Sequence, residues 1–378
     1  MDQIRTIQAS YLLDLLRLSI NGNTTIRSVP DGVDWDFMMG MASIHGILAI
    51  VWDGICKLPA DAQPNRQVRI NWGLSAQEIW DRYNGHKKVL REIISLCKVN
   101  NIRVLLLKGL CLSNLYPNPH SRPSGDIDIF LFGDYEKGNS LLSKNDYKES
   151  PKHADFQYKG VVIENHRDFL DLKSSRQIEI NNYLLNNIDK AILTDEGYYE
   201  MDASSGLLFL LMHTANHLQS QEPVPLTIRS IVDFALFLQS NEAILTPTIC
   251  MKLTEQFHVN ELFELMVRLG EWVLGINMTH YYSKRIQSEQ LFSKVKDLLL
   301  NPFYGKVDFS EYTFFQQFKI RNTLYHQLKW RNHFSMGVNI QKRDFHNHIN
   351  MQIHVLIKRL FGFPESVPFS ESIKLRRE

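Results

Sequence analysis

Apolar residues recur at helical spacing through most of the first hundred residues. The helices predicted from this spacing cover residues 3–20, 34–45, 47–56 and 75–99. The first ends at Asn21-Gly22-Asn23, a sequence typical of a helix C-terminus. Ser75 and Glu78 have the spacing of a capping box, which predicts that the long fourth helix begins there, after a linker at residues 58–64. Residues 1–99 are therefore predicted to form a mostly helical N-terminal region.

Short strand patterns replace the helical spacing between residues 100 and 200. Strands are predicted at residues 102–107, 126–132, 153–158 and 161–166, with short helices at 110–116 and 134–145. The last two strands flank Lys159-Gly160, which predicts a β-hairpin turning at the glycine. We therefore expect an α+β fold in which a small mixed β-sheet with flanking helices forms the core, residues 100–200.

Helical spacing returns after about residue 202 and continues to the end of the chain. The predicted helices cover residues 206–219, 227–239, 246–257, 261–274, 287–300, 311–333 and 349–360. Residues 201–378 are therefore predicted to be a helical C-terminal domain. A chain of 378 residues is long enough for such a division into two or three domains.

The charge balance argues against a nucleic acid partner. Lys and Arg number 42 against 41 Asp and Glu, so the net charge of +1 gives no overall attraction to a polyanion. Residues 331–354 are locally rich in cations and aromatic side chains, which is compatible with an RNA-binding surface. A solvated helical face is the favoured interpretation of that segment.

The sequence predicts a cytoplasmic protein without a membrane partner. Charged residues interrupt the apolar positions of residues 1–19, which indicates an amphipathic helix instead of a signal peptide. No apolar run has the length of a membrane span. The four cysteines have no Cys-x-x-Cys spacing and are predicted to be buried, reduced thiols: Cys56, Cys97, Cys111 and Cys250.

Two carboxylates stand at the start of the predicted strand 126–132. Asp126 and Asp128 flank Ile127, and alternate side chains of a strand point to the same face. Neighbouring carboxylates repel each other unless a cation lies between them, and Mg²⁺ prefers such oxygen ligands. Glu164 and His166 share one face of the second hairpin strand in the same way. An isolated Asp-x-Asp is commonly only a solvated turn, and this interpretation stays open beside that of a metal site.

Cations and small residues precede these carboxylates. Lys108 and Gly109 end an apolar strand before a predicted helix, an arrangement that favours anion binding. Equally, Lys108 could mark the exit of the strand to solvent. Ser124 and Gly125 would let a phosphate approach the backbone, or Ser124 could hydrogen-bond within the turn. Arg122 adds a positive charge that could pair with phosphate, orient the carboxylates or lie in an ordinary loop.

Four short motifs in residues 104–234 resemble a branch of the DNA polymerase beta-like nucleotidyltransferase superfamily known as uncharacterised, or putative, nucleotidyltransferases. These motifs are Leu107-Lys108-Gly109, Leu115-Tyr116-Pro117, Arg122-Pro123-Ser124 and Gly125-Asp126-Ile127-Asp128. The resemblance implies a third carboxylate on a later strand, for which Glu164 is the candidate, and two Mg²⁺ ions bound by Asp126, Asp128 and Glu164. It also implies nucleotide binding by Lys108, Gly109, Arg122, Ser124 and Gly125. Leu110 departs from the family pattern, which usually has Gly-Gly or Gly-Ser at this turn.

Two later helices are also similar to this family branch. His213 and His217 lie one turn apart, as do Arg229 and Asp233. Together with His166, they are candidates to line a cleft between the core and the helical domain. Packing and an intrahelical Arg229–Asp233 ion pair are alternative explanations. His213 and His217 also have the spacing of a zinc-binding pair, but Thr214 stands where such a motif has glutamate.

The expected function is that of an Mg²⁺-dependent nucleotidyltransferase. It would transfer a nucleoside monophosphate from ATP or another NTP to a hydroxyl of a small-molecule or protein acceptor. One alternative is a binding protein that retains the fold without catalysis, which Leu110 favours. A metal-dependent phosphohydrolase using the same carboxylates is a third hypothesis.

Overall fold

A computed structural model describes residues 2–282, apart from gaps at residues 23–25, 27, 145 and 220–225, together with several residues between 289 and 300. All of them belong to one compact unit, Met1–Lys329. The predicted helices 311–333 and 349–360 and the basic segment 331–354 lie outside the described residues, and the helix predicted at 287–300 is described only in part. The three-part domain division at residues 99 and 200 stays a prediction.

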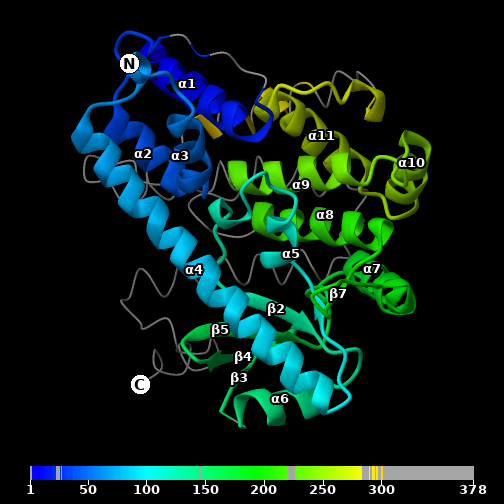
Figure 1. The fold of residues 1–378 in the computed structure, drawn as a ribbon. Coiled ribbons are helices and arrows are strands. Elements are labelled where there is room, and N and C mark those ends of the chain that lie inside the picture. Colours follow the sequence, from blue (N-terminus) through cyan, green and yellow to red (C-terminus); the bar gives the residue numbers. More distant parts are fainter. Residues whose placement is uncertain are drawn as a thin grey trace, which may run out of the picture. The chain divides into compact units, whose positions relative to one another are not determined.

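The N-terminal helices occur close to where the apolar spacing predicted them (Figure 1). They are α1 (Asp2–Ile20), α2 (Trp35–Ile44), α3 (Leu48–Cys56) and α4 (Arg66–Val99). The predicted start of α4 at Ser75 is wrong. The side chain of Asn65 accepts a hydrogen bond from Val68 N at 3.0 Å and caps the helix, so Ser75 lies in its interior. The predicted linker contains a short 3₁₀ turn, Ala60–Ala62.

The core of the fold is a mixed β-sheet of seven strands in the order β3-β4-β5-β2-β1-β7-β6. The strands are β1 (Leu105–Leu106), β2 (Ile127–Phe130), β3 (Lys148–Glu149), β4 (His153–Tyr158), β5 (Val161–His166), β6 (Ile192–Leu193) and β7 (Tyr199–Glu200). The predicted hairpin is confirmed, with Lys159 and Gly160 at φ 50° and 81° in its two-residue turn. The α+β fold predicted from the sequence is thus confirmed, although β1 and β2 are shorter than the strands expected there.

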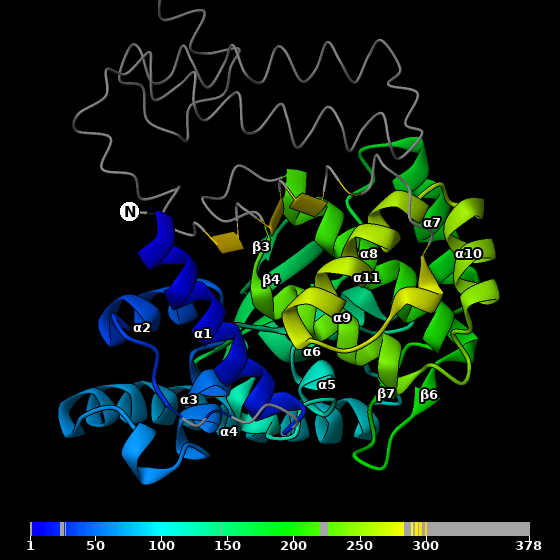
Figure 2. The ribbon, with the colours of Figure 1, turned by 90° about the horizontal axis from the view of Figure 1, so that it is seen from above.

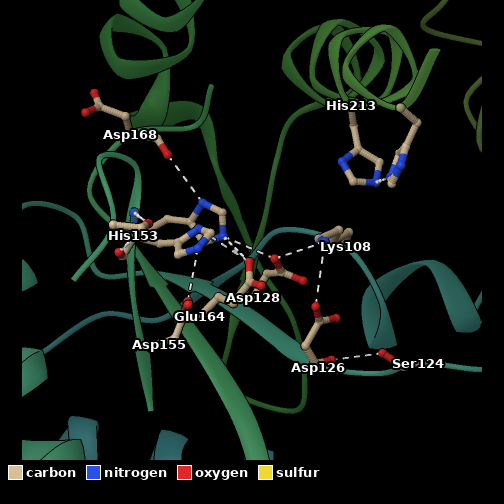
Figure 3. A network of polar contacts seen from close by, with 12 residues as sticks. Lys108, Ser124, Asp126, Asp128, His153, Asp155, Glu164, Asp168 and His213 are labelled. Atoms are coloured by element: carbon tan, nitrogen blue, oxygen red, sulfur yellow. Dashed lines mark hydrogen bonds and ion pairs between the residues drawn. The ribbon is translucent and has the colours of Figure 1, made fainter. Parts of the chain in front are cut away.

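Helices pack on one face of this sheet through apolar side chains. Ile127, Ile129 and Ile163 pack in a buried cluster with residues of α4, including Leu90 and Ile93. Helix α6 (Tyr135–Ser143) contributes Leu142 to the same cluster. Because side chains alternate along a strand, the polar side chains of β2 and β5 emerge on the opposite face. That face is turned toward α8 (Ala203–Gln219), which carries His213 (Figure 3).

The remaining helices pack around the sheet and against the N-terminal helices (Figure 2). They are α5 (Leu110–Ser113), α7 (Ser175–Asn186), α9 (Ile228–Ser240), α10 (Pro247–Gln256) and α11 (Asn260–Leu274). Arg17 of α1 donates to Val273 O at 3.1 Å and to Trp272 O at 2.6 Å, which places the first helix beside α11. Helix α7 and strands β3, β6 and β7 were not predicted from the sequence.

The four cysteines differ in how far they are buried. Cys97 and Cys250 are buried free thiols as predicted, and Cys111 is partly buried. Cys56 is exposed, contrary to the prediction, because it is the last residue of α3. None of the helices in the described part of the chain is long and apolar enough to cross a membrane.

Candidate active site

The strand register brings the three predicted carboxylates together. Strand β2 runs parallel to β5 and pairs Asp128 with Glu164. Asp126 precedes Asp128 on the same face, and ligand oxygens of Asp126, Asp128 and Glu164 all lie within 4.8 Å of one another. Asp128 is fully buried, whereas the side chains of Asp126 and Glu164 are 32% and 20% exposed. The cluster is therefore open to solvent at one end and closed at the other.

Lys108 lies among these carboxylates (Figure 3). Its Nζ is 3.2 Å from Asp128 Oδ1 and 4.0 Å from Asp126 Oδ2. Burial alone lowers the pKa of Lys108, but the charges of Asp128 and Asp126 outweigh it and raise that pKa. Burial likewise raises the pKa of Asp126, and the neighbouring Asp128 raises it further. The lysine thus supplies the counter-charge that a pair of adjacent carboxylates requires.

Two histidines and an aspartate extend the cluster across the hairpin. His166 Nε2 lies 3.1 Å from Asp128 Oδ1 and 3.3 Å from Glu164 Oε2, so its ring is directed at the carboxylates. Burial lowers the pKa of His166, but its hydrogen bonds to Asp128 and Glu164 raise it overall. His153 and Asp155 of β4 pair with His166 and Glu164 of β5 and were missed in the sequence. Their signal was present, because a two-residue turn at Lys159-Gly160 sets these pairings.

The loop before β2 is held by a close approach between Gly109 and Ser124. Gly109 has φ 66°, and a Cβ added there would lie 2.8 Å from Ser124 Oγ. Ser124 Oγ donates to Asp126 O at 2.9 Å, so Ser124 makes a turn hydrogen bond that positions Asp126. Gly125 is exposed and has open space around it. Helix α5 has only four residues where seven were expected, which leaves little helix dipole to attract an anion.

Arg122 is paired with a carboxylate of the helical region instead of facing the metal-type cluster. Its Nε donates to Asp233 Oδ1 at 2.9 Å and its Nη2 to Asp233 Oδ2 at 2.7 Å. Tyr116 OH donates to the same Asp233 Oδ1 at 2.7 Å. Burial raises the pKa of Asp233, but Arg122 outweighs this effect and lowers it. The intrahelical Arg229–Asp233 pair offered as an alternative is thus replaced by a pair between the loop and α9.

Arg229 and the α8 histidines lie nearer the carboxylates. Arg229 donates to Pro123 O at 3.3 Å, and its buried Nε has no hydrogen-bond partner among the described residues. His213 Nε2 lies 3.0 Å from His217 Nε2. Burial lowers the pKa of His213 well below its usual value, and the charge of Lys108 lowers it further. His213 is therefore a neutral ring facing Lys108 from α8 (Figure 3).

We compared the chain with models of known protein families. Residues 31–275 match a family described as uncharacterised nucleotidyltransferase. The chain belongs to this uncharacterised nucleotidyltransferase family. No curated protein and no solved structure matches the chain. The family's description supports a general nucleotidyltransferase activity, and the matched segment contains the whole β-sheet and every residue of the candidate site.

The donor set of this nucleotidyltransferase-family site fits a divalent metal ion. Asp126, Asp128 and Glu164 supply the carboxylate oxygens that Mg²⁺ prefers. Asp128 Oδ2 is buried and has no hydrogen-bond partner among the described residues. An orphaned carboxylate oxygen in a buried site is costly unless a cation or proton satisfies it. The chemistry of the site thus agrees with the general use of a nucleotide and a divalent metal that the family implies.

A cavity of about 300 Å³ lies at the C-terminal ends of β2 and β5, beyond the carboxylates. Phe130, Phe132, Tyr135, His166 and Arg167 are among its lining residues. Phe130 and His166 are paired between β2 and β5, two residues after the Asp128–Glu164 pair. Apolar and aromatic walls with few polar groups are typical of ligand pockets. The cavity therefore adjoins the cluster along the strand direction.

Proposed function

We propose that this protein is an Mg²⁺-dependent nucleotidyltransferase that transfers a nucleoside monophosphate from an NTP, with ATP the first candidate, to a hydroxyl of a small-molecule or protein acceptor. The convergence of Asp126, Asp128 and Glu164 within 4.8 Å is the observation that carries the proposal. Three carboxylates on adjacent parallel strands match the arrangement expected from the family resemblance. Two Mg²⁺ ions bound there would neutralise the triphosphate and polarise its α-phosphorus.

The protein residues have separate parts in the proposed reaction. Asp126 and Asp128 hold the metal site, and Glu164 completes it and accepts the proton of the attacking hydroxyl. The bond from the α-phosphorus to the acceptor oxygen forms as the bond to pyrophosphate breaks. Lys108 exchanges its carboxylate contacts for a phosphate oxygen when the nucleotide binds, since an ammonium group pairs with either anion. Gly109 and Ser124 position the backbone on which Asp126 stands.

The cavity beside His166 is the proposed place for the planar part of a substrate. Its lining is mainly apolar and aromatic, and Arg167 lies over Tyr135 with its guanidinium carbon 4.5 Å from the ring centre. A base or an aromatic acceptor held there would lie two residue pairs along the strands from Asp128 and Glu164. A substrate bound in this way would have its reacting groups near the carboxylates and its planar part in the cavity beyond them.

Calorimetric titration of the four NTPs, each with and without Mg²⁺, tests the proposal. The wild-type protein should bind at least one NTP only when Mg²⁺ is present, and Asp126→Asn together with Asp128→Asn should abolish that binding. Asp195→Asn is the matched control, because Asp195 is an exposed carboxylate in the turn between β6 and β7. Equal binding by the double variant and the control would contradict the metal site. Absence of binding by the wild type would overturn the proposed function.

One observation favours a second candidate, a binding protein that retains the fold without catalysis. The Arg122 guanidinium, a candidate phosphate ligand in the sequence, is bound to Asp233. Magnesium-dependent binding of an NTP without release of pyrophosphate in the presence of candidate acceptors would support this second function. Release of inorganic phosphate would instead indicate a hydrolase.

A further inference from the structure

A second donor set lies across the hairpin from the Asp126–Asp128 pair. His153, Glu164 and His166 each offer one ligand atom, and these atoms lie within 4.8 Å of one another. Glu164 Oε2 is 3.3 Å from His166 Nε2 and 3.5 Å from His153 Nδ1. Tetrahedral ligands with bonds of roughly 2.1 Å to a metal lie roughly 3.4 Å apart. The separations around Glu164 therefore match those of a small tetrahedral metal site.

An oxygen atom lies within 3.3 Å of the outer ring nitrogen of each histidine. His166 Nδ1 lies 3.3 Å from Asp168 O, and because a carbonyl only accepts, this nitrogen carries a proton. His153 Nε2 lies 3.0 Å from Asp155 Oδ1. Metal-binding histidines commonly direct their second nitrogen at a carbonyl or carboxylate, which orients the ring. Here His166 Nε2 and His153 Nδ1 are both directed at Glu164, and a metal ion bound at His166 Nε2 would replace the proton that this nitrogen donates to the carboxylates.

Hydrogen bonds alone do not account for the position of His153. Carboxylates lie against both of its ring nitrogens, Asp155 at Nε2 and Glu164 at Nδ1. A neutral imidazole has a single N–H and a single in-plane nitrogen lone pair, so with carboxylates at both nitrogens this lone pair faces a carboxylate. His153 Nδ1 is buried and has no hydrogen-bond partner in the described part of the chain. A cation bound between Nδ1 and Glu164 removes this repulsion and satisfies the orphaned nitrogen.

We propose that His153, Glu164 and His166 form a binding site for a first-row transition-metal ion such as Zn²⁺, which adjoins the magnesium-type cluster and shares Glu164 with it. Imidazole ligands favour Zn²⁺ and its neighbours, whereas Mg²⁺ favours oxygen ligands. Three protein ligands leave a fourth position for water or a substrate oxygen. The site does not depend on nucleotidyl transfer and would exist in a binding protein with the same hairpin.

Co²⁺ titration of the full-length, EDTA-treated protein tests this site directly, because Co²⁺ bound to nitrogen ligands in a tetrahedral site absorbs strongly in the visible range. The wild type should bind one Co²⁺ per chain with this strong visible absorption, and Zn²⁺ should displace that Co²⁺ while excess Mg²⁺ does not. His153→Gln should weaken Co²⁺ binding by tenfold or more. Asp155→Asn should weaken it by about tenfold, since Asp155 orients the His153 ring.

Two controls separate this site from its neighbour and from nonspecific binding. Asp126→Asn should leave Co²⁺ affinity within about twofold of the wild type, because Asp126 is not part of the donor set. His280→Gln, at an exposed histidine, should also leave it unchanged. Wild-type affinity in His153→Gln would overturn the proposal, as would displacement of Co²⁺ by Mg²⁺. Because no nucleotide is present, these outcomes are independent of the test of nucleotidyl transfer.

Discussion

Lys108 Nζ lies 3.2 Å from Asp128 Oδ1, and this ion pair joins the end of β1 to a fully buried carboxylate of β2. The side chain of Lys108 is 21% exposed, so its charge is only partly screened by water. Removing one partner of a buried pair leaves an uncompensated charge, which is far more costly than losing an exposed pair. The lysine therefore has a structural part before any metal or nucleotide is bound.

We expect Lys108→Met to lower the free energy of unfolding by about 3 kcal/mol in the presence of EDTA. Addition of Mg²⁺ should restore more stability to this variant than to the wild type, because a bound cation replaces the lost ammonium group. Urea unfolding followed by circular dichroism measures both effects. Lys173→Met, at an exposed lysine paired with Asp171, should change stability by less than about 1 kcal/mol. An equal loss of unfolding free energy in the two variants would contradict a stabilising part for the Lys108–Asp128 ion pair.

Substitution of Arg122 in its buried pair with Asp233 should also lower the free energy of unfolding strongly. Arg122 and Asp233 are 5% and 6% exposed and are joined by two hydrogen bonds. Arg122→Lys cannot form both bonds, so we expect a loss of about 2 to 3 kcal/mol in the free energy of unfolding. The matched control is Arg167→Lys at the partly exposed Arg167–Glu149 pair, for which a loss below about 1 kcal/mol is expected. Similar losses in thermal or urea unfolding would argue against an anchoring part for Arg122.

Gly109→Ala should destabilise the protein through both backbone strain and a collision. Gly109 and Gly160 both have positive φ, but only at Gly109 would a Cβ meet another atom, Ser124 Oγ at 2.8 Å. We expect Gly160→Ala to cost about 1 kcal/mol in unfolding free energy and Gly109→Ala to cost about 1 to 2 kcal/mol more. Adding Ser124→Ala to Gly109→Ala should recover part of this excess. No recovery in the double variant would show that the collision is not the cause.

Stability should fall as the pH falls through the titration of His45. Burial lowers its pKa from 6.5 to about 4, so the unfolded chain binds a proton that the folded protein does not. Between these two pH values the free energy of unfolding therefore rises with pH, and His45 contributes about 3 kcal/mol of acid sensitivity over the window. Urea unfolding between pH 7 and pH 4 should show this slope.

The His45→Gln variant should lose that part of the slope, since its amide can take the hydrogen bonds to Leu299 O and from Ile228 N without titrating. His258→Asn, at an exposed histidine with φ 52°, should keep the wild-type slope. An unchanged slope in His45→Gln would assign the acid sensitivity to other groups.

Much of the secondary structure was predictable because its causes are local. Alternation along residues 161–166 places Glu164 and His166 on one face, and the Lys159-Gly160 turn sets the hairpin register. That register also paired His153 and Asp155 with these residues, so both were accessible to sequence reasoning although neither was named. The start of α4 shows the limit of local signals, because both Asn65 and Ser75 are good capping residues and packing decided between them.

Sequence alone established strands β1, β2, β4 and β5, the hairpin and the shared face of Asp126 and Asp128, since side-chain period and turn conformation depend on residues a few positions apart. The tertiary structure decided which strands became neighbours. Parallel pairing of β2 with β5 brought Glu164 to Asp128, and the end of β1 brought Lys108 between the carboxylates. It also gave Asp233 a partner 111 residues away, Arg122, where the spacing within α9 had suggested Arg229. Such contacts depend on how the whole core packs, and no short window of sequence contains that information.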